Sequence, residues 1–224
     1  MKNKNISRSA VILLGLMASF PIASRADSII FNDFAAGHSY NSGAGLTIAG
    51  TLPGFVEWGE PLTPNARFDL TEIEMALGWV AGVNGVTVSL DTNDGGGPGR
   101  ALASWSFVGL PRFGTTNSIV QTMAFAHGIV LQPGQTYWLV TAPLAANTQA
   151  VWNSNSTGVT GLGAVNFGNV WLTEKVTSGA FEVLGKSVVP EPSIWLLFGT
   201  GLLGILGAIR KEKRCARTRG YSES

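Results

Sequence analysis

Short apolar stretches of about four to eight residues, separated by Gly, Pro and Asn, run through residues 27–187. Stretches of this length between turn-forming residues are typical of β-strands. Residues 86–90 alternate strictly, which places Val86, Val88 and Leu90 on one face of a strand. The pattern therefore predicts an all-β domain, an antiparallel β-sandwich of jelly-roll-like type. Further strands are predicted at residues 102–108, 119–125 and 136–141.

Residues 68–77 allow two interpretations. Their composition would suit a helix, but their apolar positions also suit a strand whose alternation shifts by one residue part-way, as a β-bulge would produce. The neighbouring segments favour a strand. The apolar positions in question are Phe68, Leu70, Ile73, Met75 and Leu77.

Turn-forming residues punctuate the predicted strands. Asn84-Gly85 is expected to form a tight hairpin, because both residues tolerate positive φ angles. Residues 132–135 are predicted to form a turn, and the Gly-rich residues 94–99 a flexible loop. A repeat of the length found in propellers or solenoids is not visible, which argues against those folds.

The first 26 residues have the three parts of a secretory signal peptide. Basic residues come first, the apolar residues 10–20 follow, and small residues precede a cleavage site after Ala26. The apolar run is too short to cross a membrane comfortably, because a span needs roughly 17 to 25 residues. We therefore expect export by the Sec machinery and a mature chain that begins at Asp27.

The C-terminal end carries a second apolar segment. Residues 194–209 are uncharged, and as a helix they would extend about 24 Å, at the short end of a membrane span. Lys and Arg concentrate on the cytoplasmic side of a span, so the domain is predicted to lie outside and residues 215–224, with the only cysteine, Cys215, inside. The basic cluster after the span consists of Arg210, Lys211, Lys213 and Arg214.

Three glycines in this predicted transmembrane helix, Gly201, Gly204 and Gly207, fall at intervals of three. Such a small-residue face would let another helix approach closely. Glycine is also common in membrane helices in general, so both interpretations remain open.

The C-terminal segments occur in a specific order: Pro190-Glu191-Pro192, then the apolar span, then the basic cluster. This arrangement, over residues 188–214, is similar to the PEP-CTERM sorting signal of Gram-negative bacteria that make exopolysaccharide. The resemblance implies recognition by an exosortase, a membrane-embedded cysteine transpeptidase that cuts near the Pro-Glu-Pro. Pro190, Glu191 and Pro192 would then be its substrate.

The charge balance changes when both ends are set aside. Residues 27–189 contain five Lys and Arg but eleven Asp and Glu, which gives 5 − 11 = −6. Nucleic acids and anionic membranes require clustered basic residues, so neither is an expected partner of the domain. The domain also has no cysteine, and therefore no disulfide or thiol nucleophile.

A second resemblance covers residues 30–165. An alternating strand is followed by Asp-Thr-Asn-Asp-Gly-Gly-Gly-Pro-Gly-Arg at residues 91–100, then by residues 131–140 and Trp152. This order resembles the choice-of-anchor domains, in particular the type lettered R. Those extracellular β-rich modules occur with different C-terminal anchors, and the resemblance transfers no site residues.

One segment has oxygen donors that suit calcium. Asp91, Asn93 and Asp94 lie just before two glycines, as at the start of a calcium-binding loop. Position 12 of that loop would be Leu102 in place of a bidentate Glu, which excludes an EF-hand. A looser calcium site and an ordinary polar hairpin loop both remain possible, because Asp, Asn and Gly are also common turn residues.

Catalytic signatures are weak. The two histidines, His38 and His127, have no metal-ligand spacing to another His or Cys, and no G-x-S-x-G elbow occurs. A glycosidase needs two carboxyl groups about 5 to 9.5 Å apart, which sequence spacing cannot establish. Tryptophans could be sugar platforms or core residues. The candidate carboxylates are Glu57, Glu60, Glu72 and Glu74.

These observations lead to one hypothesis with two alternatives. We expect a non-catalytic cell-surface or extracellular-matrix protein, without cofactor, sorted by an exosortase and associated with exopolysaccharide or biofilm. The first alternative is a carbohydrate-binding module or adhesin that uses exposed tryptophans and possible calcium. The second is a secreted hydrolase.

Overall fold

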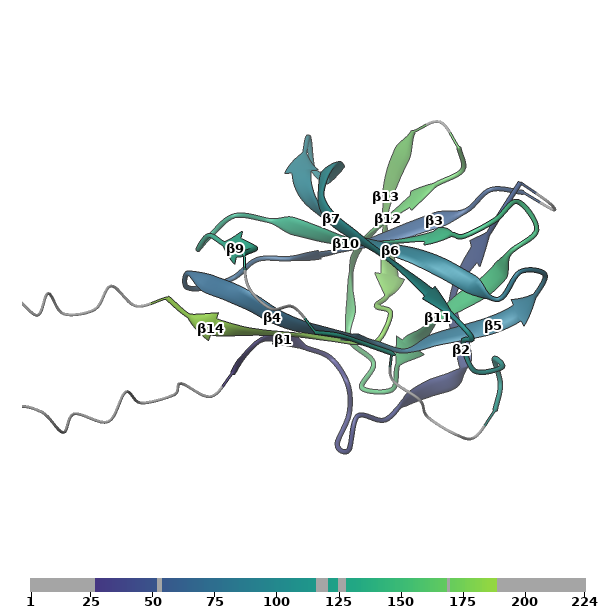
Figure 1. Cartoon of the computed structure of the whole chain (residues 1–224), viewed down its shortest axis with the longest axis horizontal. Helices are drawn as coiled ribbons and strands as arrows, with labels where there is room; N and C mark the ends of the chain where they lie inside the picture. Colours follow the sequence, from purple (N-terminus) through teal and green to yellow (C-terminus); the bar gives the residue numbers. More distant parts are fainter. Residues whose placement is uncertain (1–26, 52–53, 116–120, 125–127, 169, 189–224) are drawn as a thin grey trace, which may run out of the picture. The chain divides into compact units, whose positions relative to one another are not determined.

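A computed structural model describes residues 27–51, 54–115, 121–124, 128–168 and 170–188, and every named element in these ranges is a β-strand (Figure 1). The six-stranded sheet has the order β13(Trp171–Thr177), β12(Thr160–Asn166), β3(Glu57–Leu62), β10(Tyr137–Pro143), β6(Gly85–Asp94), β7(Gly97–Val108). The five-stranded sheet contains β1(Ser28–Asn32), β14(Phe181–Ser187), β4(Phe68–Met75) and β8(Gln121–Ala124), with β9(Val130–Leu131) also paired to β4. The three-stranded sheet has the order β2(Tyr40–Ala49), β11(Gln149–Asn155), β5(Leu77–Ala81).

All pairs between these strands are antiparallel. The prediction of an all-β domain with antiparallel sheets is therefore confirmed. No helix among the described residues is long and apolar enough to cross a membrane. The predicted signal peptide and the predicted span at 194–209 lie outside the described residues.

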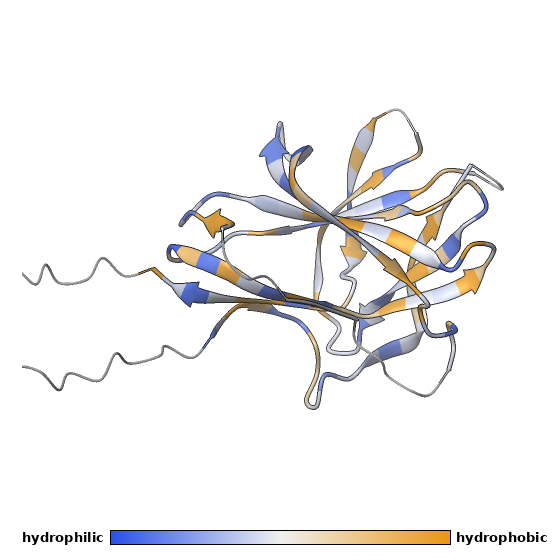
Figure 2. Ribbon diagram, viewed as in Figure 1, coloured by the Kyte–Doolittle hydropathy of each residue, from blue (hydrophilic) through white to orange (hydrophobic). Residues whose placement is uncertain are grey.

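One hydrophobic core receives side chains from all three sheets. In β6, Val86, Val88 and Leu90 are fully buried, as their alternation predicts, and hydrophobic and polar bands alternate along the strand in Figure 2. Strand β10 is buried on both faces over its first five residues, and it corresponds to the strand predicted at 136–141. The predicted strands at 102–108 and 119–125 correspond to β7 and β8.

Strand β4 contains the phase shift that its sequence predicts. Leu184 of β14 pairs with Glu72, and the next residue, Gly185, pairs with Leu70, so Thr71 is the extra residue of a β-bulge. The bulge lets apolar residues on both sides of Thr71 face the same core although their spacing changes. The predicted strand at 68–77 does not continue to its end, because Ala76 separates β4 from β5.

Two turn predictions were wrong. Asn84-Gly85 connects β5 to β6, which belong to different sheets, and the Asn84 side chain instead exchanges hydrogen bonds with the backbone of Leu110 at 2.8 and 3.0 Å. The loop predicted at 94–99 is a two-residue hairpin turn between paired Asp94 and Gly97. Gly95 and Gly96 both have positive φ, as that tight connection requires.

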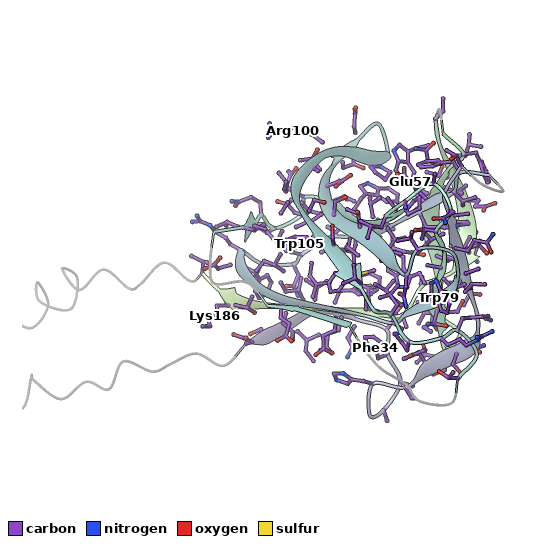
Figure 3. All side chains as sticks on the ribbon, turned by 45° about the vertical axis from the view of Figure 1, so that its right-hand side comes forward. Phe34, Glu57, Trp79, Arg100, Trp105 and Lys186 are labelled. Carbon is purple, nitrogen blue, oxygen red and sulfur yellow. The ribbon has the colours of Figure 1, made fainter. Side chains whose placement is uncertain are left out.

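Most tryptophans contribute to packing. Trp138 and Trp152 are fully buried, and Trp58 is 9% exposed. Trp79 and Trp105 are half-buried against the core (Figure 3). Trp171 packs on the second face of the six-stranded sheet and is likewise half-buried.

Candidate functional site

A tight turn between β1 and β2 presents the one described histidine. Ala35 and Ser39 form an isolated antiparallel bridge, and Gly37 and His38 between them both have positive φ, 70° and 55°. Apart from glycines, His38 is the only described residue with a positive φ. The Phe34 ring stacks on the imidazole, with centroids 5.5 Å apart and planes at 8°. The turn therefore fixes the position of this residue beside the sheet.

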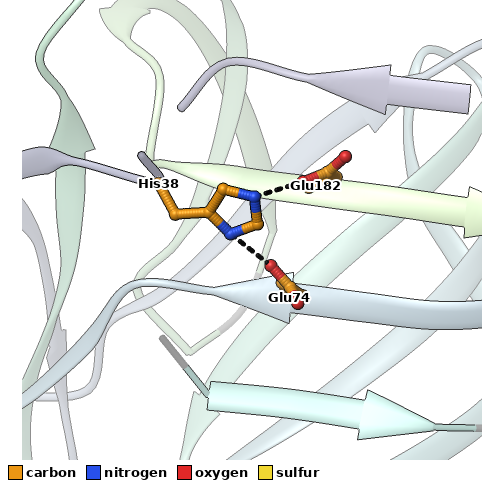
Figure 4. Close-up of side chains that lie close together, drawn as sticks. All are labelled: His38, Glu74 and Glu182. Carbon is orange, nitrogen blue, oxygen red and sulfur yellow. Dashed lines mark ion pairs between the residues drawn. The ribbon is translucent and has the colours of Figure 1, made fainter. Parts of the chain in front are cut away.

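Two carboxylates from different strands face the imidazole of His38 (Figure 4). His38 Nδ1 lies 2.8 Å from Glu74 Oε2 of β4, and His38 Nε2 lies 3.4 Å from Glu182 Oε2 of β14. The shorter contact lacks the alignment of a hydrogen bond, since Glu74 Oε2 is buried without a hydrogen-bond partner among the described residues. We call His38, Glu74 and Glu182 the His38 cluster.

The two carboxylates of the His38 cluster are placed unfavourably for each other. Glu74 and Glu182 are directly opposite in the register of β4 and β14, and like charges in that arrangement destabilise a sheet. The side chain of Glu182 is 5% exposed, and burial raises its pKa, which His38 partly offsets and Glu74 and Glu72 increase further. A positive charge close to Glu74 and Glu182 would therefore stabilise this part of the sheet.

The calcium candidates do not converge in this way. Asp91 is buried, whereas Asn93 and Asp94 are exposed at the end of β6 beside the hairpin turn. Asn93 Oδ1 already accepts a hydrogen bond from the Trp138 indole at 2.9 Å. Burial raises the pKa of Asp91, and its Oδ1 has no partner among the described residues. Calcium binding here stays a prediction.

A second pair of acidic residues is buried inside the domain. Glu60 is 2% exposed and accepts a hydrogen bond from the Gly179 N–H at 3.4 Å, and burial raises its pKa to about 8. Asp33 accepts a hydrogen bond from the Phe181 N–H at 2.8 Å, and burial raises its pKa to about 6. Each group therefore stays protonated in the folded chain up to a higher pH than a free carboxyl group does.

The other carboxylates considered for hydrolysis have separate environments. Glu57 accepts a hydrogen bond from Asn166 at 3.0 Å, and burial raises its pKa, with Asp91 adding to the rise. Burial also raises the pKa of Glu72, with Glu74 contributing. A polar hollow lies apart from the His38 cluster and is lined by Thr92, Asn93, Gln132, Pro133, Gly134, Gln135, Thr136 and Tyr137.

The sorting residues follow directly after the domain. The last strand, β14, ends at Ser187, and Pro190, Glu191 and Pro192 come a few residues later, outside the described residues. Residues 188–211 match the PEP-CTERM protein-sorting motif. The PEP-CTERM motif implies an exported protein that is sorted by an exosortase.

The PEP-CTERM match does not extend into the β domain. No curated protein matches this chain. The resemblance to choice-of-anchor domains therefore stays a prediction. So does the small-residue face of Gly201, Gly204 and Gly207, which lies with the basic cluster outside the described residues.

The His38 cluster was not predicted from the sequence. Its members come from three distant segments and show no metal-ligand spacing. One signal was available: Glu72 and Glu74 alternate on a predicted strand, so their side chains project from the same face. The pairing of β4 with β14, which brings Glu182 opposite Glu74, could not be read from one sequence.

Proposed function

We propose that this chain is a non-catalytic cell-surface or extracellular-matrix protein whose β domain is delivered by its PEP-CTERM tail. In this proposal the Sec machinery exports the chain, residues 194–209 hold it in the membrane, and an exosortase cuts near Pro190-Glu191-Pro192. The domain, of β-sandwich class and jelly-roll-like, then remains at the surface or in the exopolysaccharide matrix.

One observation supports this order of events most strongly. Strand β14 pairs with β1 on one side and with β4 on the other, and it ends at Ser187. The sorting motif begins at the next residue. Cleavage near Pro190 would therefore remove no strand and break no strand pairing among the described residues.

Deletion of residues 194–224 tests the sorting step. We expect the truncated chain to leave the membrane fraction and to accumulate in the periplasm or the medium, with an unchanged far-UV circular dichroism spectrum. A matched control replaces Glu174, an exposed residue of β13, with Gln and should leave location unchanged. An unchanged location of the truncated chain would reject sorting by the tail.

The charge of the domain supports a role outside the cell without nucleic acid. The formal excess of acidic residues in 27–189 disfavours polyanions as partners. Association with exopolysaccharide would then depend on hydrogen bonding rather than on charge attraction to anionic polymers.

Carbohydrate binding is the second candidate, and the polar hollow beside β6 and β10 favours it. Its lining offers amide and hydroxyl groups from Asn93, Gln132 and Gln135, among others, which can bind sugar hydroxyls. The expected result is binding on a glycan array that Gln135→Ala weakens. Absence of any binding, with and without calcium, would reject this candidate.

A further inference from the structure

The His38 cluster has two features that are unfavourable in a β-sheet: two neighbouring carboxylates and the burial of one of them. Glu74 and Glu182 are direct cross-strand neighbours, and Glu182 is almost fully buried. Glu74 Oε2 is shielded from solvent and accepts no hydrogen bond from the described part of the chain. A buried carboxylate oxygen without a donor is costly, so a cation at this position would relieve both features.

His38 supplies a donor of a different kind. Its imidazole is held over the two carboxylates by the turn at 35–39 and by the stacked ring of Phe34. The ligand atoms of His38, Glu74 and Glu182 all lie within 4.8 Å of one another. They come from a turn and from two adjacent strands, so the sheet fixes two of the three positions.

We propose that His38, Glu74 and Glu182 bind one divalent transition-metal ion, and that Zn²⁺ is the ion their donor set fits best. One ring nitrogen and two carboxylate oxygens provide three protein ligands. A water molecule completes a four-coordinate site, which is the usual arrangement where a zinc site keeps an open position.

The donor types separate Zn²⁺ from the Ca²⁺ of the earlier prediction. Ca²⁺ and Mg²⁺ take oxygen ligands almost exclusively, whereas imidazole suits zinc and its neighbours. Tetrahedral zinc with bonds of about 2.1 Å needs donors about 3.4 Å apart. The exposed half of His38 leaves its ring room to turn, so that one nitrogen faces both carboxylates. This site is separate from Asp91, Asn93 and Asp94 of β6.

The rival arrangement is a purely ionic one. A protonated His38 between Glu74 and Glu182 would supply one positive charge without any metal. It predicts no zinc binding, and it makes the contribution of the cluster to stability independent of divalent ions. The two arrangements therefore differ in a measurable way.

The experiment is isothermal titration calorimetry of ZnCl₂ into the full chain, purified in detergent and freed of metal with a chelator. All variants carry Cys215→Ser, which removes the only thiol of the chain. We expect one ion per chain with a dissociation constant below about 100 μM, and a higher unfolding temperature with zinc. Parallel titrations with CaCl₂ should give much weaker binding.

Two substitutions each remove one proposed zinc ligand and change the surrounding structure little. His38→Asn keeps a residue that tolerates positive φ, and Glu74→Gln keeps the shape of the side chain. Each should weaken zinc binding about 100-fold or more, since even partners of zinc ligands contribute 10- to 100-fold. His127→Asn and Glu174→Gln are the matched controls and should bind zinc as the parent does.

Circular dichroism of each variant shows whether it remains folded. Zinc binding that both ligand variants lose, in folded protein, supports the site. Undetectable binding by the parent chain would overturn it in favour of the ionic arrangement. Binding that survives His38→Asn and Glu74→Gln would overturn it too, because the ion would then lie elsewhere.

Discussion

Glu60 lies in the interior between β10 and β12, where a carboxylate is poorly solvated. Its folded pKa of about 8 exceeds the ordinary value of 4.5. Below about pH 4.5 the group is protonated in both states. As the pH rises from 4.5 to 8, only the unfolded chain releases the proton, so the free energy of unfolding falls. Asp33, with a pKa of about 6, acts in the same direction.

The variant Glu60→Gln tests this pH dependence. Gln keeps an oxygen that can accept the Gly179 N–H but does not ionise. We expect the variant to be more stable than the parent at pH 8, by up to a few kcal/mol, and similar to it at pH 5. Urea unfolding of the full chain at both values measures this. An equal pH dependence in both proteins would contradict the burial argument, and Glu174→Gln is the exposed control.

Single residues show clearly what one sequence can and cannot predict. The burial of Val86, Val88 and Leu90 follows from alternation alone, because strand geometry is local. The His38 cluster depends on which strands pair, and that is decided by the whole core. Asn84 was assigned to a hairpin from its type, whereas its side chain bonds the distant backbone of Leu110.

The strands predicted best are those whose apolar alternation can be seen within their own residues. The bulge in β4 was visible because the apolar alternation itself shifts at Thr71. The hairpin between β6 and β7 was predicted only as a loop, because its glycines allow many conformations in the unfolded chain. Pairing selects one of them, a two-residue turn at Gly95-Gly96.

This hairpin turn provides a prediction about β6 and β7. A Cβ at Gly95 would meet no atom within 4 Å, but the residue has a φ of 59°. Gly95→Ala should therefore lower the free energy of unfolding by about 1 kcal/mol through backbone strain alone. Gly43→Ala in β2, with ordinary contact at 3.6 Å and no positive φ, is the matched control and should be nearly neutral. Equal urea midpoints for the two variants would contradict the argument.

The whole chain combines a β domain whose last described strand ends at Ser187 with a sorting motif that begins at the next residue. The tail was predictable because its parts are contiguous and their order is specific. The molecular role of the domain was not, because its candidate ligands belong to separate strands and turns. The acidic balance of residues 27–189 and the basic ends are consistent with a domain that is exported and then separated from both.

Mass spectrometry of the mature protein from its own cells tests this account most directly. The account predicts an N-terminus at Asp27 and a C-terminus near Pro190-Glu191-Pro192, free or joined to another group. The basic residues after Ile209 should be absent from the surface form. A surface form that still extends to Ser224 would contradict processing by an exosortase.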